Sequence, residues 1–263
     1  MLSDAQRETF RRNGFLVLRD ALDDDRVREA REAVLADDSM SQGNQNEPST
    51  EPFRTMNETL FEYAESLVGD GLLPPGHPDF GTVDDEETRV GLHYPTGDLG
   101  SIDDPRAHRA AREGLGVHVD HQSNAAGALY ALGAAIYLDD VRPRDAGFTV
   151  WPGSHWMTAE HCELVETETR GAELLVARVR EDSPYDDREA LFEHYEPFEI
   201  AGEAGTVTLW HGGLIHSAGM HLAPGRLRMA CFSRFHLAPE AWDAAGGMPA
   251  PFAHWDGVDG DAP

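Results

Sequence analysis

Residues 206–216 read Thr-Val-Thr-Leu-Trp-His-Gly-Gly-Leu-Ile-His. Gly205 and Gly212 bound the apolar run 206–211, and this arrangement is typical of a short strand between turns. Other segments of the same kind lie at 88–94, 115–119, 131–138, 147–151, 173–179, 196–200 and 227–236. Eight short strands separated by turns predict an all-β sandwich or an open barrel.

The N-terminal part carries helix signals instead. Ser3 and Gln6 have the spacing of a capping box, and Gly14 suits the left-handed residue that ends a helix. The acidic run 23–25 predicts the start of a second helix, because acidic side chains are favourable at a helix N-terminus. The apolar spacing of residues 56–68 predicts a third helix.

We therefore predict a mainly β fold with N-terminal helices, organised as one domain over residues 1–263. A four-residue strand, 15–18, should follow the first helix, and the polar stretch 36–52 should be a solvated loop. The expected boundaries are about 1–75 for the helical part, about 85–238 for the β core and 240–263 for a partly ordered tail.

Acidic residues are in large excess. The 263 residues include 48 Asp and Glu against 21 basic residues, all of them Arg, for a net charge of −27. A charge of about −0.1 per residue repels itself in a compact state unless salt screens it. We therefore expect a halophile-like source, although a GC-rich genome also replaces Lys by Arg. The same charge disfavours nucleic acid and anionic membranes as partners.

Compartment signals are few. No apolar run approaches the roughly 20 residues that span a bilayer. Residues 1–4 lack the basic region and apolar stretch of a signal peptide. The two cysteines, Cys162 and Cys231, fit no metal-binding spacing and favour a reducing compartment. We expect a soluble, cytoplasmic protein.

The chemistry-bearing pattern is His118-Val119-Asp120, followed far along the chain by His216. In a strand, residues i and i+2 point to the same face, so His118 and Asp120 can bind one metal together. Two histidines and one carboxylate on one face of an octahedron leave three positions open, as in non-haem Fe(II) oxygenases. A zinc hydrolase that also uses His121 is the alternative, because zinc accepts the same ligand types.

Three further stretches carry a family resemblance. They are Phe-Arg-Arg-Asn-Gly-Phe-Leu-Val-Leu at 10–18, Tyr-Leu-Asp-Asp-Val at 137–141 with Gly-Phe-Thr-Val-Trp-Pro-Gly-Ser-His at 147–155, and Trp-His-Gly-Gly-Leu-Ile-His-Ser at 210–217. In this order, around the His-x-Asp pattern, they resemble the phytanoyl-CoA dioxygenase (PhyH) family of Fe(II)/2-oxoglutarate-dependent oxygenases. The resemblance covers most of the chain.

The resemblance implies a double-stranded β-helix, a cupin-like jelly roll. It implies that His118, Asp120 and His216 hold Fe(II) and form the catalytic centre, with 2-oxoglutarate and O₂ as co-substrates. The implied reaction hydroxylates an unactivated C–H bond of a small organic molecule and releases succinate and CO₂. Related halogenases lack the carboxylate, so Asp120 favours hydroxylation.

The distal carboxylate of 2-oxoglutarate needs a cation, and the planar guanidinium of Arg suits it. Counting forward from His216 as in the family reaches Leu227, between Arg226 and Arg228. Counting back from Arg234 selects Arg228. We expect Arg228 to bind the co-substrate and keep Arg226 as the alternative.

Several points stay open at this stage. The family often has a hydroxyl two residues after the distal histidine, where this chain has Ala218, so Ser217 is a weaker candidate for a co-substrate contact. His155 is expected to be structural. A catalytically silent jelly-roll binding protein is the alternative to an enzyme. The substrate and the oligomeric state are not specified by the sequence.

Overall fold

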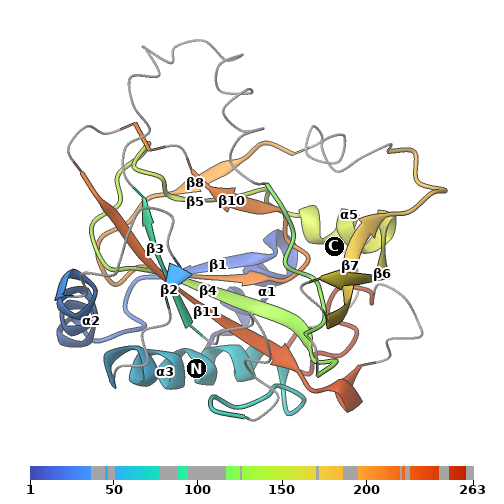
Figure 1. Cartoon of the computed structure of the whole chain (residues 1–263), viewed down its shortest axis with the longest axis horizontal. Helices are drawn as coiled ribbons and strands as arrows, with labels where there is room; N and C mark the ends of the chain where they lie inside the picture. The colour runs from blue at the N-terminus through green and yellow to red at the C-terminus, as the bar shows by residue number, and fades with distance from the viewer. Residues whose placement is uncertain are drawn as a thin grey trace.

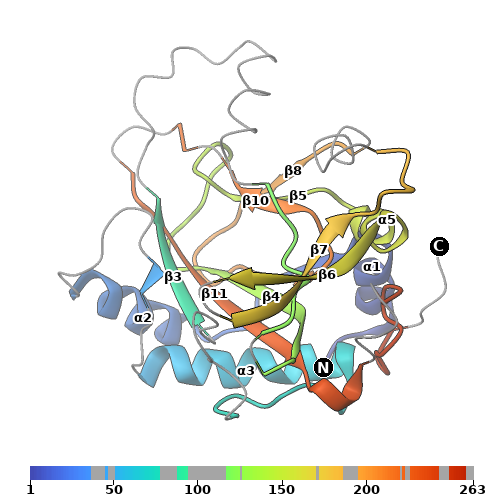
Figure 2. The ribbon, with the colours of Figure 1, turned by 45° about the vertical axis from the view of Figure 1, so that its right-hand side comes forward.

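The computed structural model describes residues 1–36, 45–46, 51–77, 88–93, 117–124, 126–169, 172–185, 195–219, 221–222, 226–242 and 249–258. Within these ranges the protein is layered. Three N-terminal helices cover one face of a six-stranded sheet, and a three-stranded sheet lies on its other side (Figure 1). A two-stranded hairpin flanks the sheets near α5, as the turned view in Figure 2 also shows.

The α-helices within the described residues are α1 (Asp4–Asn13), α2 (Asp24–Ala36), α3 (Glu51–Val68) and α5 (Ser154–His161), and η1 (Pro239–Ala241) is a short 3-10 helix. The capping box of α1 is confirmed: the Gln6 amide donates to the Ser3 hydroxyl, and the Ser3 amide donates to the Gln6 side chain. Gly14 ends this helix at φ 76°, a conformation that residues with a side chain rarely adopt. The acidic run starts α2 as predicted.

The six-stranded sheet is antiparallel throughout, in the order β1-β9-β4-β11-β3-β2. Its strands are β1 (Phe15–Leu18), β9 (Val207–His211), β4 (Leu129–Tyr137), β11 (Arg228–Leu237), β3 (Thr88–His93) and β2 (Gln45–Asn46). The three-stranded sheet contains β10 (His216–Ala218), β5 (Phe148–Val150) and β8 (Phe198–Ile200). The hairpin pairs β6 (Cys162–Thr169) with β7 (Ala172–Val179). The predicted β core with N-terminal helices is therefore confirmed.

Two hydrophobic clusters hold the layers together. Because side chains alternate between the faces of a strand, Met229 and Cys231 of β11 pack toward the helices, whereas Ala230 and Phe232 face the second sheet. The cluster between the two sheets, called the inner cluster below, also contains Tyr130, Ala135, Tyr137, Val141, Phe148, Val150, Ile200, Trp210 and Leu214. This cluster lies beside the candidate site.

The predicted strand 115–119 is not a regular strand where it can be seen. Residues 115 and 116 lie outside the described residues, and residues 117–124 form isolated bridges. His118 bridges His216, while Gln122 bridges Val176 of β7. The segment changes partner along its length, so no continuous ladder forms.

Other elements differ from the sequence prediction. α3 begins at Glu51 rather than at residue 56, because Pro52 is tolerated in the first turn of a helix. β2 falls within the predicted loop 36–52, of which residues 37–44 and 47–50 lie outside the described residues. α5, β6 and β10 were not predicted. The N-cap of α5 is Gly153, which makes no side-chain cap hydrogen bond, so the usual start signal is missing.

Residues 249–258 pack onto the core. Phe252 and Trp255 are buried, and their rings lie 6.1 Å and 5.7 Å from the ring of Phe10. Residues 243–248 and 259–263 of the predicted tail lie outside the described residues. No helix in the described part of the chain combines the length and hydropathy that a membrane crossing requires.

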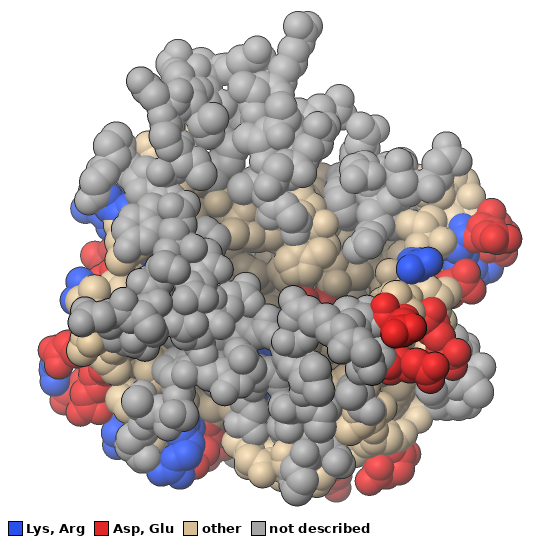
Figure 3. Space-filling view, in the orientation of Figure 1, with Lys and Arg blue, Asp and Glu red and all other residues tan. Residues whose placement is uncertain are grey.

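Charged side chains lie mainly toward the edges of the face in Figure 3, and its centre is hollowed. On the hairpin, the exposed acidic residues are Glu163, Glu166, Glu168 and Glu173. Close acidic side chains of this kind repel each other where water and salt do not screen them.

Candidate metal centre

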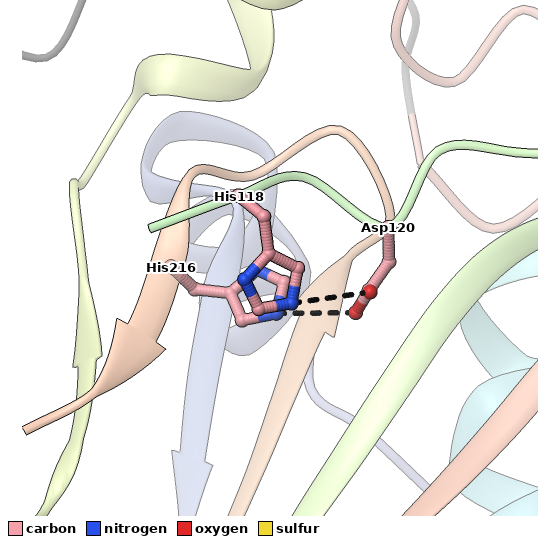
Figure 4. A group of neighbouring side chains, drawn as sticks. All are labelled: His118, Asp120 and His216. Atoms are coloured by element: carbon pink, nitrogen blue, oxygen red, sulfur yellow. Dashed lines mark ion pairs between the residues drawn. The ribbon is translucent and has the colours of Figure 1, made fainter. Parts of the chain in front are cut away.

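Three metal-ligand side chains meet beside the inner cluster (Figure 4). His118 and Asp120 come from the bridging segment 117–124, and His216 begins β10. One ligand atom from each residue lies within 4.8 Å of the others. His118 Nε2 is 3.5 Å from Asp120 Oδ1, and His216 Nε2 is 3.1 Å from Asp120 Oδ2. The structure thus brings together the three ligands that the sequence suggested.

Backbone hydrogen bonds hold the ligands in place. The amides of His118 and His216 each donate to the carbonyl of the other residue at 3.0 Å. The Asp120 amide donates to the Gly212 carbonyl at 2.9 Å. Backbone hydrogen bonds therefore join the segment that carries His118 and Asp120 to residues 212–216, which carry His216, independently of any side-chain contact.

The turn between β9 and β10 also sets the orientation of His216. Its Nδ1 lies 2.9 Å from the Leu214 carbonyl oxygen, which can only accept a hydrogen bond. Nδ1 therefore carries a hydrogen, and Nε2 is the ring nitrogen directed at Asp120 and available to a metal. A backbone carbonyl on the second ring nitrogen is common for metal-binding histidines. His211 shapes the same turn, since its Nδ1 accepts from the Gly213 amide at 3.0 Å.

The electrostatics favour a bound cation. Burial opposes ionisation of Asp120, but the attraction of His216 and the hydrogen bond from His118 hold its pKa well below the usual value. The carboxylate is thus ionised at neutral pH. The His118 side chain is 46% exposed, whereas that of His216 is 4% exposed. The centre is therefore open to small molecules on the side of His118.

A second polar group lies in the same layer of the protein. Arg228 is 1% exposed, and no other described residue forms a hydrogen bond with its three guanidinium nitrogens. Burial lowers the pKa of Arg228 to about 10, so the group stays charged at neutral pH. Its guanidinium lies 5.5 Å from the ring centroid of Phe232. A buried charge without a partner is costly, and a bound carboxylate would satisfy it.

Aromatic rings connect Arg228 to the three ligands. The Phe232 ring lies 6.4 Å from that of Phe148 and 6.5 Å from that of Trp210. Both of these rings contact His216, at 5.2 Å and 5.3 Å. Arg228 and the three ligands therefore border one apolar region between the sheets. A co-substrate that contacts both the metal and Arg228 would lie in this region.

The other two candidates for the co-substrate lie elsewhere. Arg226 Nε is 3.2 Å from Asp145 Oδ2, and this arginine is partly exposed. The Ser217 hydroxyl donates to the Ala218 carbonyl at 2.8 Å. Ser217 pairs with Thr149 across β10 and β5, on the face away from the inner cluster. The structure therefore places Arg228, but neither Arg226 nor Ser217, in the apolar region beside the ligands.

Three further residues support the site: His155, Trp210 and Gly133. The sequence predicted a role only for His155. His155 is buried, and its Nε2 lies 3.0 Å from the Arg11 carbonyl, which fits the structural role predicted for it. Trp210 was not proposed as part of the site, yet its indole N–H lies 3.4 Å from Asp120 Oδ2. Gly133 could not be identified from the sequence, because its role depends on Trp210, which lies opposite it on β9.

The comparison with protein families bears directly on this geometry. The phytanoyl-CoA dioxygenase (PhyH) family model matches residues 10–230. The chain belongs to the PhyH family. The comparison of this PhyH-family chain with curated proteins gives no match.

Solved structures of similar proteins confirm the fold. EctD from S. alaskensis in its apoform has a TM-score of 0.55 and 18% identity, over 95% of this chain and 80% of EctD. HygX from Streptomyces hygroscopicus, solved with nickel and 2-oxoglutarate bound, has a TM-score of 0.54 and 14% identity, over 90% of this chain and 88% of HygX. The non-haem alpha-ketoglutarate-dependent epimerase SnoN from nogalamycin biosynthesis has a TM-score of 0.52 and 16% identity, over 89% and 83%. The predicted cupin-like jelly roll is confirmed.

Proposed function

We propose that this PhyH-family protein is a non-haem Fe(II)- and 2-oxoglutarate-dependent dioxygenase. In the proposed reaction it hydroxylates an unactivated C–H bond of a small organic substrate, with release of succinate and CO₂. One observation carries the proposal: a two-histidine, one-carboxylate set borders the same apolar region as a buried guanidinium with which no described residue forms a hydrogen bond. The nickel and 2-oxoglutarate of HygX support the choice of co-substrate.

Each residue has a defined task. His118, Asp120 and His216 would hold the iron and leave positions for the co-substrates. Arg228 would bind the distal carboxylate of 2-oxoglutarate through its planar N–H groups. The bound iron and 2-oxoglutarate would supply the oxidising power, whereas the protein positions the substrate and excludes water. Phe148 and Trp210 serve this exclusion, since their rings cover His216.

Hydroxylation is the finer part of the proposal. The intact carboxylate of Asp120 favours it over halogenation. SnoN is named as an epimerase, so related folds support other outcomes. Mass spectrometry of the product separates these outcomes, because hydroxylation adds one oxygen atom, desaturation removes two hydrogens and epimerisation leaves the mass unchanged.

The site itself is tested by an anaerobic titration in molar KCl, first with Fe(II) and then with 2-oxoglutarate, followed by visible absorption. A weak charge-transfer band that requires both additions supports the proposal. The band should be lost in Asp120→Ala and kept in Asp182→Ala, where the removed carboxylate pairs with Arg180 at 2.6 Å. A folded protein without the band would be a silent binding protein of the same fold. Turnover with zinc but without 2-oxoglutarate would instead favour a hydrolase.

The proposed setting is the cytoplasm of a halophile-like source. Cys162 and Cys231 are both free and buried, which supports a reducing compartment. The net charge of −27 supports a high-salt environment. Neither feature enters the assignment of the site.

A further inference from the structure

We propose that Trp210, seated over Gly133, is a positioning residue that makes Asp120 bind the metal through one oxygen atom. The inference rests on the proposed function, since it requires a metal at His118, Asp120 and His216. It concerns a side chain that binds neither the metal nor the co-substrate. Its effect would pass through the hydrogen bond to Asp120.

Gly133 makes room for the indole. It lies in the middle of the fully buried strand β4, directly opposite Trp210 of β9. A Cβ atom at Gly133 would come within 2.1 Å of Trp210 Cζ2 and 2.3 Å of Cε2. Glycine weakens a strand interior, so its presence there often marks a close approach. Here the close approach is that of the Trp210 ring, which lies across β4.

The position of the ring brings its N–H to the carboxylate. Trp210 Nε1 lies 3.4 Å from Asp120 Oδ2, at the long end of the hydrogen-bond range. The ring is buried and packs at 4.7 Å from the Phe148 ring and 5.3 Å from the His216 ring. It is therefore held from several sides, and its one polar group is directed at a ligand rather than at water.

In the contact between Trp210 and Asp120, the indole is always the donor and the carboxylate the acceptor. An indole N–H can donate but cannot accept, so it favours the ionised carboxylate. The indole N–H occupies one acceptor position of Oδ2, which favours Oδ1 as the oxygen that binds the metal. A carboxylate that uses one oxygen occupies one coordination position and keeps three open beside two histidines. Removal of a hydrogen-bond partner of a metal ligand typically weakens metal binding about 10–100-fold.

The test compares two Trp→Phe variants by anaerobic titration with Co(II), followed by its visible absorption. Trp210→Phe keeps an aromatic ring and removes the N–H that reaches Asp120. Trp242→Phe is the matched control, because Trp242 is also buried and its Nε1 donates to the Gly127 carbonyl at 3.1 Å. We expect Trp210→Phe to bind Co(II) about 10–100-fold more weakly and with a changed absorption intensity. Trp242→Phe should resemble the wild type in both respects.

Gly133→Ala provides an independent perturbation of the same contact. The added methyl group should displace the indole and weaken Co(II) binding as Trp210→Phe does. In the double variant Gly133→Ala/Trp210→Phe the two losses should not add, because both remove one interaction. If Gly133→Ala does not fold, Trp210→Phe decides the question alone.

The outcomes separate this inference from the proposed function. A folded Trp210→Phe with wild-type Co(II) affinity and spectrum would overturn the positioning role, while the metal site would stand. A wild-type protein that binds no Co(II) would overturn the metal site, and this inference with it.

Discussion

Replacing Arg228 by methionine should stabilise the ligand-free protein and remove its response to 2-oxoglutarate. Methionine keeps the unbranched, flexible stem, ends two atoms short of the terminal guanidinium nitrogens and lacks the charge. The guanidinium has no hydrogen-bond partner among the described residues, so the substitution breaks no protein–protein hydrogen bond there. The same change removes the group that we assign to the co-substrate carboxylate.

The size of the stabilisation follows from the pKa. Burial lowers the pKa of Arg228 to about 10, well below its usual value. At about 1.4 kcal/mol for each pH unit, the charged form costs the folded state about 3 kcal/mol. Because the folded pKa lies below the unfolded one, this cost is complete at neutral pH and disappears only as the pH rises above both values. Loss of the contact with Phe232 should offset about 1–2 kcal/mol of the gain.

The assay is thermal unfolding followed by circular dichroism, with and without Mn(II) and 2-oxoglutarate. A net gain of about 1–2 kcal/mol corresponds to a rise in Tm of about 2–8 °C. Saturation with 2-oxoglutarate at 100 times its Kd should stabilise the wild type by about 2.7 kcal/mol. Arg228→Met should have the higher Tm without ligand and should not be stabilised further by 2-oxoglutarate.

Arg226→Met is the matched control. Arg226 pairs with Asp145 outside the apolar region, so its loss should leave the 2-oxoglutarate shift intact and lower Tm slightly. A full 2-oxoglutarate shift in Arg228→Met would refute the assignment of Arg228. If Arg226→Met instead loses the rise in Tm caused by 2-oxoglutarate, Arg226 is the residue that binds the co-substrate.

Three further predictions concern the centre, the salt dependence and the pH dependence. Asp120→Ala should abolish succinate release coupled to product, and retained coupled turnover would show that another carboxylate is the ligand. The Tm should rise between 0.1 M and 1 M KCl, because the screening length falls from about 10 Å to about 3 Å; a Tm indifferent to salt would contradict the halophile-like interpretation. Burial lowers the pKa of His155 from 6.5 to about 4, although its hydrogen bond with Arg11 opposes this. The folded state therefore loses up to about 3 kcal/mol as the pH falls from 6.5 to 4, and urea unfolding at pH 7.5 and 5 should show a smaller loss in His155→Gln than in the wild type.

The elements that the sequence predicted well are those with local signals. Ser3, Gln6 and Gly14 lie within one helix and its caps, and their roles depend only on neighbours a few residues away. The strand predicted at 227–236 is observed at Arg228–Leu237, because its apolar pattern ends where the strand ends. The elements missed, such as α5 after Gly153, lack these local signals.

The ligand-bearing segment was harder to predict because its conformation comes from distant chain segments. The Asp120 amide donates to Gly212, and the Ala177 amide of β7 donates to the carbonyl of His121. These partners lie far along the chain, and each bonds to a different residue of 117–124. A pattern read from neighbouring residues can predict that the segment is extended, but not that it is shared between two parts of the fold.

The candidate site likewise combines residues that the sequence identifies with residues that only the structure identifies. His118, Asp120 and His216 could be identified because imidazole and carboxylate groups have chemistry that a sequence states directly. Their supports have no such signal: the Gly212 and Leu214 carbonyls are groups that every residue has, and Gly133 contributes the absence of a side chain. Trp210 connects the two kinds of residue, since its N–H reaches Asp120 only because its ring lies over Gly133. The sequence therefore identifies which atoms could hold a metal, whereas the structure identifies which variants should change how firmly they hold it.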